Sequence, residues 1–190
     1  FIAEKPGVVV DATHPYALEV SDNIRRACLE AGIEFLRVRR EGQAVQDGED
    51  CVRFGTLPEL IEWLRGQEGI AFNTMGAKEA AAFTALPNYR ERVFTRILPS
   101  IEGLTDCLEL GYPARHIICM QGPFSQALNE AMFQSARARI LVTKDSGPQG
   151  GFAEKIGAAQ ALGMRVALLT RPDEADAAGY PLEIVLERIL

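Results

Sequence analysis

The chain has 190 residues, of which 47% are hydrophobic and 24% charged, and its formal net charge is −6. Its length suffices for one substantial hydrophobic core or two small ones, and its composition is that of an ordinary globular protein. The acidic balance argues against nucleic acid as a partner, because neutralising phosphates requires clustered Lys and Arg. No apolar run approaches the roughly 20 residues that span a bilayer, so we expect a cytoplasmic protein without membrane contact.

Apolar runs and helical periodicities alternate along the chain, which is typical of an α/β fold with a mainly parallel sheet. Three valines before Asp11 predict a first buried strand, and Pro15 suits the first turn of the helix that follows. Before Pro99, the predicted strands are 8–10, 33–38, 51–54, 70–74 and 93–98, and the predicted helices are 17–31, 77–85 and one opened by a capping box at 56–59. The polar segment 39–50 is predicted to be an exposed loop.

The same alternation restarts near Ser100. Beyond it, the predicted helices are 101–110, 124–137, 154–162 and 182–190, and the predicted strands are 116–120, 140–143 and 166–169. We therefore predict two Rossmann-like lobes, residues 1–99 and 100–190, with mainly parallel sheets and a cleft between them. The chain begins at Phe1 without an initiating Met, and its first residues resemble the end of a helix that leads into the first strand. We therefore expect the natural protein to have further sequence before Phe1.

The cysteines lie far apart in the sequence, without a CxxC pair, and each sits in an apolar pattern. They are Cys28, Cys51, Cys107 and Cys119. This spacing predicts buried free thiols in a cytoplasmic protein. Because only His14 and His116 could join them as nitrogen ligands, we expect no metal site.

Four junctions share one pattern, in which a strand ends, a polar turn follows and a helix begins. They are 13–16, 73–78, 121–125 and 143–151. If the strands are parallel, these turns lie on the sheet edge where open α/β proteins bind ligands. Their backbone N–H groups and hydroxyls, together with Lys78 and Lys144, are groups that hold a phosphate. One such turn is a structural need of any α/β protein, whereas four with polar residues favour a ligand site.

Several single residues have two interpretations that the sequence leaves open. His14 could cap the following helix or act in catalysis, and Asp11 could do no more than anchor the turn. Arg37, Arg39 and Arg40 could form a strand end in solvent or bind the carboxylates of a substrate. The sequence has no GxGxxG after a strand, no GxxxxGKS and no GxSxG. Motifs alone therefore indicate an α/β protein that binds a phosphorylated small molecule. Such a protein could be a transferase, an isomerase or a two-lobed binding module.

At these same turns the sequence resembles the precorrin-6A reductase family of cobalamin biosynthesis, including its cobalt-precorrin-6A branch. The matching segments are Asp11–Ala17, Asn73–Lys78, Arg92–Pro99, Gln121–Ser125 and Leu141–Gly147, with further likeness near Glu154 and at 169–172. The match runs along nearly the whole chain in order and spacing. The family also has an amino-terminal strand with a Gly-Gly-Thr turn, which this sequence lacks.

The resemblance implies a reductase that uses NADPH or NADH, without flavin, to reduce a ring double bond of a multiply carboxylated tetrapyrrole macrocycle. A hydride would reach one ring carbon and a proton its neighbour, and His14 is the candidate if a residue supplies that proton. By their matched positions in the family, seven residues would contact the phosphates or the ribose of the cofactor. They are Thr13, Gly76, Lys78, Thr143, Lys144, Ser146 and Gly147. They assign the substrate cleft to Tyr16, Gln121, Gly122 and Ser125.

Overall fold

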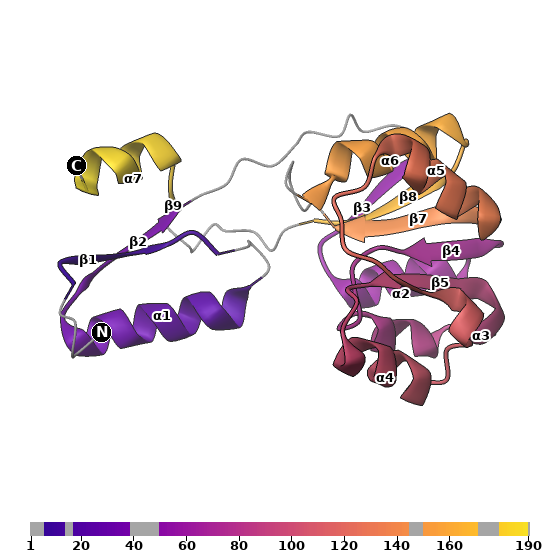
Figure 1. Cartoon of the computed structure of the whole chain (residues 1–190), viewed down its shortest axis with the longest axis horizontal. Helices are drawn as coiled ribbons and strands as arrows, with labels where there is room; N and C mark the ends of the chain where they lie inside the picture. The colour runs from indigo at the N-terminus through magenta and orange to yellow at the C-terminus, as the bar shows by residue number, and fades with distance from the viewer. Residues whose placement is uncertain (1–5, 14–16, 39–49, 145–149, 171–178, 190) are drawn as a thin grey trace. The chain divides into compact units, whose positions relative to one another are not determined.

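The computed structural model describes residues 6–13, 17–38, 50–144, 150–170 and 179–189, and the chain forms two compact units (Figure 1). Unit 1 combines Phe1–Gly42 with Arg171–Leu190, and unit 2 is Gln43–Thr170. Each unit contains one sheet, and every strand pairing in the described ranges is parallel, so the predicted α/β class with mainly parallel sheets is confirmed.

The predicted lobe boundary between residues 99 and 100 is wrong. Strand β5 (Val93–Ile97) lies before it and β6 (Ile117–Cys119) after it, yet the two pair in register in one sheet. The alternation of strands and helices restarts near Ser100 because a new crossover begins there, not a new domain. The crevice described below therefore lies within unit 2.

Unit 1 is a small sheet with a helix after its first strand and another at the end of the chain. Its strands in spatial order are β1 (Val8–Asp11), β2 (Glu34–Val38) and β9 (Gly179–Tyr180), and its helices are α1 (Leu18–Ala31) and α7 (Leu182–Ile189). Gly32 ends α1 in the left-handed region at φ 66°, as glycine does readily. The strand β9 was not predicted, because two residues are too few to carry a periodic pattern.

Unit 2 has a six-stranded sheet in the order β3-β8-β7-β4-β5-β6. The strands not yet given are β3 (Cys51–Phe54), β4 (Ile70–Asn73), β7 (Ala138–Lys144) and β8 (Arg165–Leu169). From β4 the chain moves to β5 and β6 on one side, and it later returns to place β7 and β8 on the other. The strand order thus reverses between β4 and β7, which is where an open α/β sheet forms its ligand crevice.

Helices cover both faces of this sheet (Figure 1). They are α2 (Leu57–Arg65), α3 (Tyr89–Arg92), α4 (Ile101–Glu109), α5 (Gln126–Ser135) and α6 (Phe152–Ala161), with 3-10 turns η1 (Ala80–Ala85) and η2 (Ala114–His116). The predicted capping box is confirmed, since Thr56 and Glu59 cap α2 reciprocally. Within the described residues, no helix has both the length and the hydrophobicity that crossing a membrane requires.

Successive side chains of the central strands enter two different cores. Ala71 of β4 and Val142 of β7 belong to the core under α2 and α4, whereas Phe72 and Leu141 belong to the core under α5 and α6. This alternation follows from the two-residue period of a strand. Both central strands are therefore buried on both faces, and their carboxyl ends are fixed rigidly where the crevice opens.

Two predicted elements around the crevice are shorter than expected. The helix predicted at 77–85 is a 3-10 turn that starts at Ala80, because Gly76 at φ 111° and a hydrogen bond of 2.9 Å from Met75 N to Asn73 Oδ1 keep the chain in a turn. The helix predicted from 124 starts at Gln126, because Ser125 caps it by accepting a hydrogen bond from Leu128 N. The predicted loop at 39–50 lies, except for Asp50, outside the described residues.

The prediction of buried free thiols is right for two of the four cysteines. Cys28 and Cys107 are buried, whereas Cys51 is half-buried and Cys119 is exposed. Cys119 is exposed because it ends β6, which is an edge strand of the sheet. All four are free thiols.

His116 is a buried imidazole just before β6. It is 5% exposed and its ring stacks on Phe94, with 4.0 Å between the ring centroids. Among the described residues, its Nδ1 atom has no hydrogen-bond partner. Burial lowers the pKa of His116 from its ordinary 6.5, and the charge of Arg115 lowers it further. The folded protein therefore favours the neutral ring, and unfolding takes up a proton at acid pH.

We expect the free energy of unfolding to fall as the pH drops below about 6.5, because the unfolded chain binds the proton that folded His116 resists. The contribution is at most about 1.4 kcal/mol per pH unit, between the unfolded pKa and the lowered folded pKa. Denaturant unfolding of the wild type and His116→Phe at several pH values measures it, because Phe retains the stacking on Phe94 but does not titrate. Equal acid slopes for the two proteins would show that His116 carries none of the effect.

Candidate functional site

Two adjacent pockets open in unit 2 around the carboxyl end of β4, where the strand order reverses. Pocket 1 has a volume of about 300 Å³ and pocket 2 of about 380 Å³. They share Met75, Gly76 and Leu98, so a ligand larger than either could extend from one into the other. Their position at the strand ends is the expected one for an open parallel sheet.

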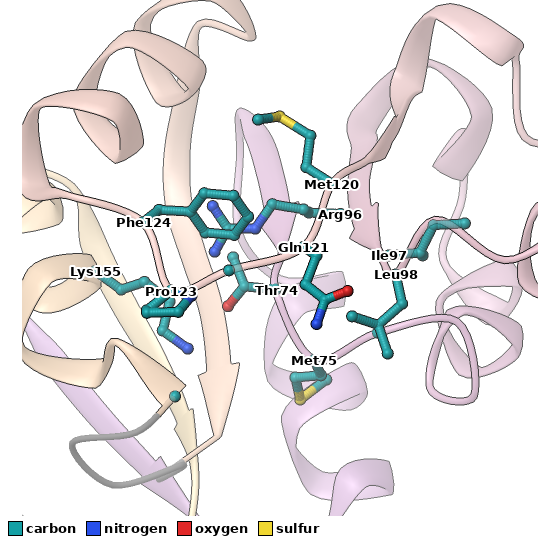
Figure 2. A pocket seen from close by; sticks show the side chains of 13 residues that line it. Thr74, Met75, Arg96, Ile97, Leu98, Met120, Gln121, Pro123, Phe124 and Lys155 are labelled. Carbon is teal, nitrogen blue, oxygen red and sulfur yellow. The ribbon is translucent and has the colours of Figure 1, made fainter.

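Pocket 1 is lined by three chain turns and by the start of α6 (Figure 2). Its lining comprises 74–76 after β4, 96–98 at the end of β5, 120–124 after β6, and Gly150 and Lys155. Methionine, leucine, isoleucine and phenylalanine side chains supply an apolar surface, and Arg96 and Lys155 supply positive charge. The described residues that line pocket 1 include no acidic side chain. This combination suits a ligand with a flat apolar body and anionic groups.

Arg96 is a largely buried cation on β5, 7% exposed. Its guanidinium lies 4.2 Å from the centroid of the Phe124 ring, an arrangement that Figure 2 shows. Its Nη1 donates a hydrogen bond of 2.8 Å to Oδ1 of Asn129, a fully buried residue of α5. Burial lowers the pKa of Arg96 to about 10, so the side chain remains a cation at neutral pH.

Asn129 connects Arg96 to the loop that lines pocket 1. Its Nδ2 donates to the backbone oxygens of Phe124 and Ser125, at 3.3 and 3.0 Å. The side-chain amide thereby holds both the cation and the backbone of Phe124, whose ring lies against that cation. A buried polar side chain with all of these bonds made fixes one geometry for Arg96 before any ligand arrives.

Lys155 is a second buried cation, 5% exposed, on the first turns of α6. Burial lowers the pKa of Lys155 to about 8, with further lowering by the positive charges of Arg96 and Lys144, while Glu154 opposes the shift. Keeping like charges close together away from water costs free energy in the folded protein. Strongly shifted groups in a pocket are typical of functional sites, and here they point to an anionic ligand.

Pocket 2 has mixed charge. Apart from the residues it shares with pocket 1, it is lined by Ala77, Lys78, Glu79, Ser100, Glu102, Gly103, Asp106 and Lys144. Lys144 Nζ and Glu79 Oε1 form an ion pair at 2.9 Å, with side chains 20% and 21% exposed. This pair connects the end of β7 to the turn before η1, across the point where the strand order reverses.

Across the described ranges, no group of three or more His, Cys, Asp or Glu side chains is arranged to hold a metal ion.

A family model described as "Precorrin-6x reductase CbiJ/CobK" matches residues 1–189. The chain belongs to this family. The match covers both units, so the two discontinuous pieces of unit 1 and the whole of unit 2 are parts of the family's common sequence pattern.

Curated members of the family resemble the chain at moderate identity. A cobalt-precorrin-6A reductase of Methanothermobacter thermautotrophicus is 38% identical over 170 residues, which are 87% of this chain and 55% of that protein. Cobalt-precorrin-6A reductases of Priestia megaterium and Salmonella typhimurium are 33% and 32% identical, over 86% of this chain and 65% and 62% of their own lengths. The chain therefore spans between about half and two thirds of these relatives.

A solved structure described as "CobK precorrin-6A reductase" has the same fold. It aligns with a TM-score of 0.74 over 98% of this chain and 74% of that one, at 23% identity. At this identity the likeness supports the arrangement of strands and helices, and the roles of single residues must be argued from this chain itself.

The structure brings together part of the site predicted from the sequence. Gln121 and Gly122, predicted to line the substrate cleft, line pocket 1. Lys78 and Lys144, predicted to contact the cofactor, line pocket 2, and Gly76 lines both pockets. These five positions therefore surround one crevice, although their assigned contacts stay predictions.

Other predicted site residues lie elsewhere or outside the described ranges. Thr143 is fully buried and Ser125 uses its hydroxyl to cap α5, and neither is part of the described lining of either pocket. Thr13 belongs to unit 1, where its Oγ1 lies 3.2 Å from Ser21 Oγ. The residues His14, Tyr16, Ser146 and Gly147 lie outside the described residues, so the catalytic role of His14 stays a prediction.

Asp11 and Arg37 form a buried network in unit 1. Asp11 accepts a hydrogen bond of 2.9 Å from Thr13 N, which confirms that it anchors the turn after β1. Burial raises the pKa of Asp11, but hydrogen bonds from Ser21, Thr13 and Arg37 outweigh it and lower the pKa overall. The interpretation of Arg37 as a solvated strand end is wrong, because it is 4% exposed and donates to Asp11 and Ser21.

Sequence reasoning missed the two cations of pocket 1 and the amide that supports Arg96. A usable signal existed for each charge. Arg96 interrupts the apolar run of a strand predicted to be buried, and Lys155 follows Phe152 by three residues, on the stripe that turns toward the core. A charged residue at a core position is rare unless it is paired or functional.

We expect the affinity of the chain for an anionic ligand, such as a carboxylated porphyrin, to fall as the pH rises through about 8, where Lys155 loses its proton. The loss should reach up to about tenfold one pH unit above the pKa, because only the ammonium form attracts the ligand. Calorimetric titration across this range measures it, with Lys155→Arg as the control that stays charged. A wild-type affinity as insensitive to pH as that of Lys155→Arg would exclude Lys155 from the ligand contacts.

Proposed function

We propose that the protein carrying this chain reduces one ring double bond of precorrin-6A or cobalt-precorrin-6A in cobalamin biosynthesis, with NADPH or NADH as the hydride source. The observation that carries the proposal is the family match over residues 1–189. The names of the relatives from three organisms agree with it, as cobalt-precorrin-6A reductases. These likenesses favour a reductase over the transferase, isomerase or simple binding module that the motifs alone left open.

We propose that pocket 1 binds one edge of the macrocycle. Its apolar lining offers a surface for the flat ring system, and Arg96 and Lys155 offer charge-assisted bonds to carboxylate arms. An Arg fork binds a carboxylate through two parallel N–H groups, and Asn129 and Phe124 orient this fork in advance. A carboxylate of the substrate beside each cation would offset part of the free energy that burial of the charge costs.

The chain's contribution to catalysis is mainly positioning in this proposal. The nicotinamide, when bound, supplies a hydride to one ring carbon, and a proton must reach the neighbouring carbon. Holding the macrocycle by its carboxylates in an apolar crevice fixes the acceptor carbon and excludes water from it. His14 remains our candidate for delivering the proton, if a residue does so.

The proposal that pocket 2 binds the phosphates of the cofactor has less support. Lys78 and Lys144 line it, as predicted for cofactor contacts, but Glu79, Glu102 and Asp106 line it as well. A diphosphate there would have to displace Glu79 from Lys144. The cytoplasm, where nicotinamide nucleotides are available, is the proposed compartment, in keeping with four free thiols.

Turnover tests the proposal directly. The natural protein that contains this sequence should convert cobalt-precorrin-6A or precorrin-6A to a product heavier by two hydrogens while it consumes NADPH or NADH. Mass spectrometry of the pigment and the absorbance of the reduced nicotinamide measure the two changes together. A folded protein that consumes neither nucleotide with either substrate would refute the proposed reaction.

We expect Arg96→Met to bind a carboxylated porphyrin about ten- to a hundredfold more weakly, because it loses a hydrogen bond to a charged group that contributes roughly 1.5–3 kcal/mol. Met fills a similar volume beside Phe124 and Met132, so the variant should stay folded. Arg139→Met is the matched control, because Arg139 is exposed near the start of β7, away from the pocket. Equal affinities for Arg96→Met and the control would remove Arg96 from the site.

A further inference from the structure

The ion pair between Lys144 and Glu79 lies in pocket 2, close to a residue that lines both pockets. Lys144 ends β7 and Glu79 precedes η1, and both side chains line pocket 2. A Cβ atom at Gly76, which lines both pockets, would lie 3.8 Å from Oε2 of Glu79. A ligand that extends from pocket 1 past Gly76 into pocket 2 therefore comes close to this pair.

Lys144 also acts on Lys155, one of the two cations of pocket 1. Its positive charge is one of the causes that lower the pKa of Lys155. Lys144 is thus electrostatically coupled to Lys155 of pocket 1, while its ion pair with Glu79 lies in pocket 2. Glu79 offsets one of these positive charges from within the chain.

We propose that Glu79 is an internal competitor for Lys144, which holds this lysine until an anionic group of the ligand replaces it. The inference rests on the proposed function, in which an anionic ligand occupies pocket 1. The replacing group is an anionic oxygen, either a carboxylate of the macrocycle or a phosphate of the nicotinamide nucleotide. Glu79 therefore sets which ligands bind well, and it is a specificity-determining residue.

The exchange is physically balanced. Lys144 gives up one carboxylate at 2.9 Å for another anion, so its charge stays paired throughout. Glu79 is 21% exposed, so its carboxylate can turn into the water of pocket 2 when it is released. Because the pair is already partly solvated, breaking it costs less than breaking a fully buried pair.

Ligand size then decides the affinity. A small anion that reaches Arg96 and Lys155 alone leaves the Lys144–Glu79 pair intact and gains nothing from it. A ligand that spans both pockets gains Lys144 but must displace Glu79, so part of its binding free energy is spent on the exchange. Replacing Glu79 by a neutral side chain removes this competition, and the spanning ligand binds more tightly.

The test compares Glu79→Gln with Glu102→Gln. Both variants remove one carboxylate from the lining of pocket 2 and keep the side-chain size, but the carboxylate that pairs with Lys144 at 2.9 Å is that of Glu79. The probes are uroporphyrin, as a tetrapyrrole with carboxylates around its rim, and NADPH. Calorimetry on the wild-type chain and both variants gives the dissociation constants, and thermal unfolding confirms that each variant is folded.

We expect Glu79→Gln to bind at least one probe about tenfold more tightly than the wild type, and Glu102→Gln to differ from the wild type by less than about twofold. The probe that gains affinity identifies the anion, as carboxylate or phosphate. An unchanged or weaker affinity for both probes would mean that the pair is only a structural contact, and an equal gain in Glu102→Gln would mean bulk electrostatics. Either result overturns the inference, while turnover of the natural protein decides the proposed function separately.

Discussion

Keeping Arg96 and Lys155 charged inside one pocket is the constraint on which the site depends. Each side chain is less than a tenth exposed, and each has its pKa lowered by burial. Such an arrangement persists because neighbouring groups take over part of the role of water. The amide oxygen of Asn129 and the face of Phe124 do so for Arg96. The remaining unfavourable free energy of burying the two charges would be offset by an anionic ligand, so the folded chain favours binding one.

The topology of unit 2 explains why both charges reach the same crevice. Alternation along β5 directs Arg96 to the face covered by α5, while Ile97 joins the opposite core. Lys155 belongs to α6, which covers that same face and packs against α5. Because the chain leaves β4 toward one face and β7 toward the other, the space between these strand ends stays open. A strand order without a reversal would have closed that space with a crossover.

Local patterns predicted most of the elements and a part of the site. The capping box at Thr56 and the apolar runs of β3, β4 and β7 depend on neighbours in sequence, so their signals survive without tertiary information. The predicted lobe boundary was wrong because the sequence of neither strand alone indicates that β5 and β6 pair. Pairing of β9 with β2 joins residues from opposite ends of the chain, which periodicity cannot reveal.

The site residues divide by the same physical rule. Gly76, Gln121 and Gly122 could be anticipated because a polar turn after a buried strand is a local feature. The ion pair between Lys144 and Glu79 joins residues 65 positions apart, and the bond between Arg96 and Asn129 joins residues 33 apart. These contacts form only when the sheet is assembled. The sequence can therefore indicate that a charged residue is unusual, but it cannot indicate which residue pairs with it.

A crevice that holds only positive charge would bind a polycarboxylate tightly, yet an enzyme must also release its product. Reduction of one ring double bond leaves the carboxylate arms of such a macrocycle unchanged, so the anionic contacts hold substrate and product alike. Contacts of this kind lower the energies of both complexes equally and do nothing for the chemical step. A carboxylate of the chain's own at the edge of the crevice, which Glu79 provides, limits that uniform binding. The cations then orient the ligand without retaining it.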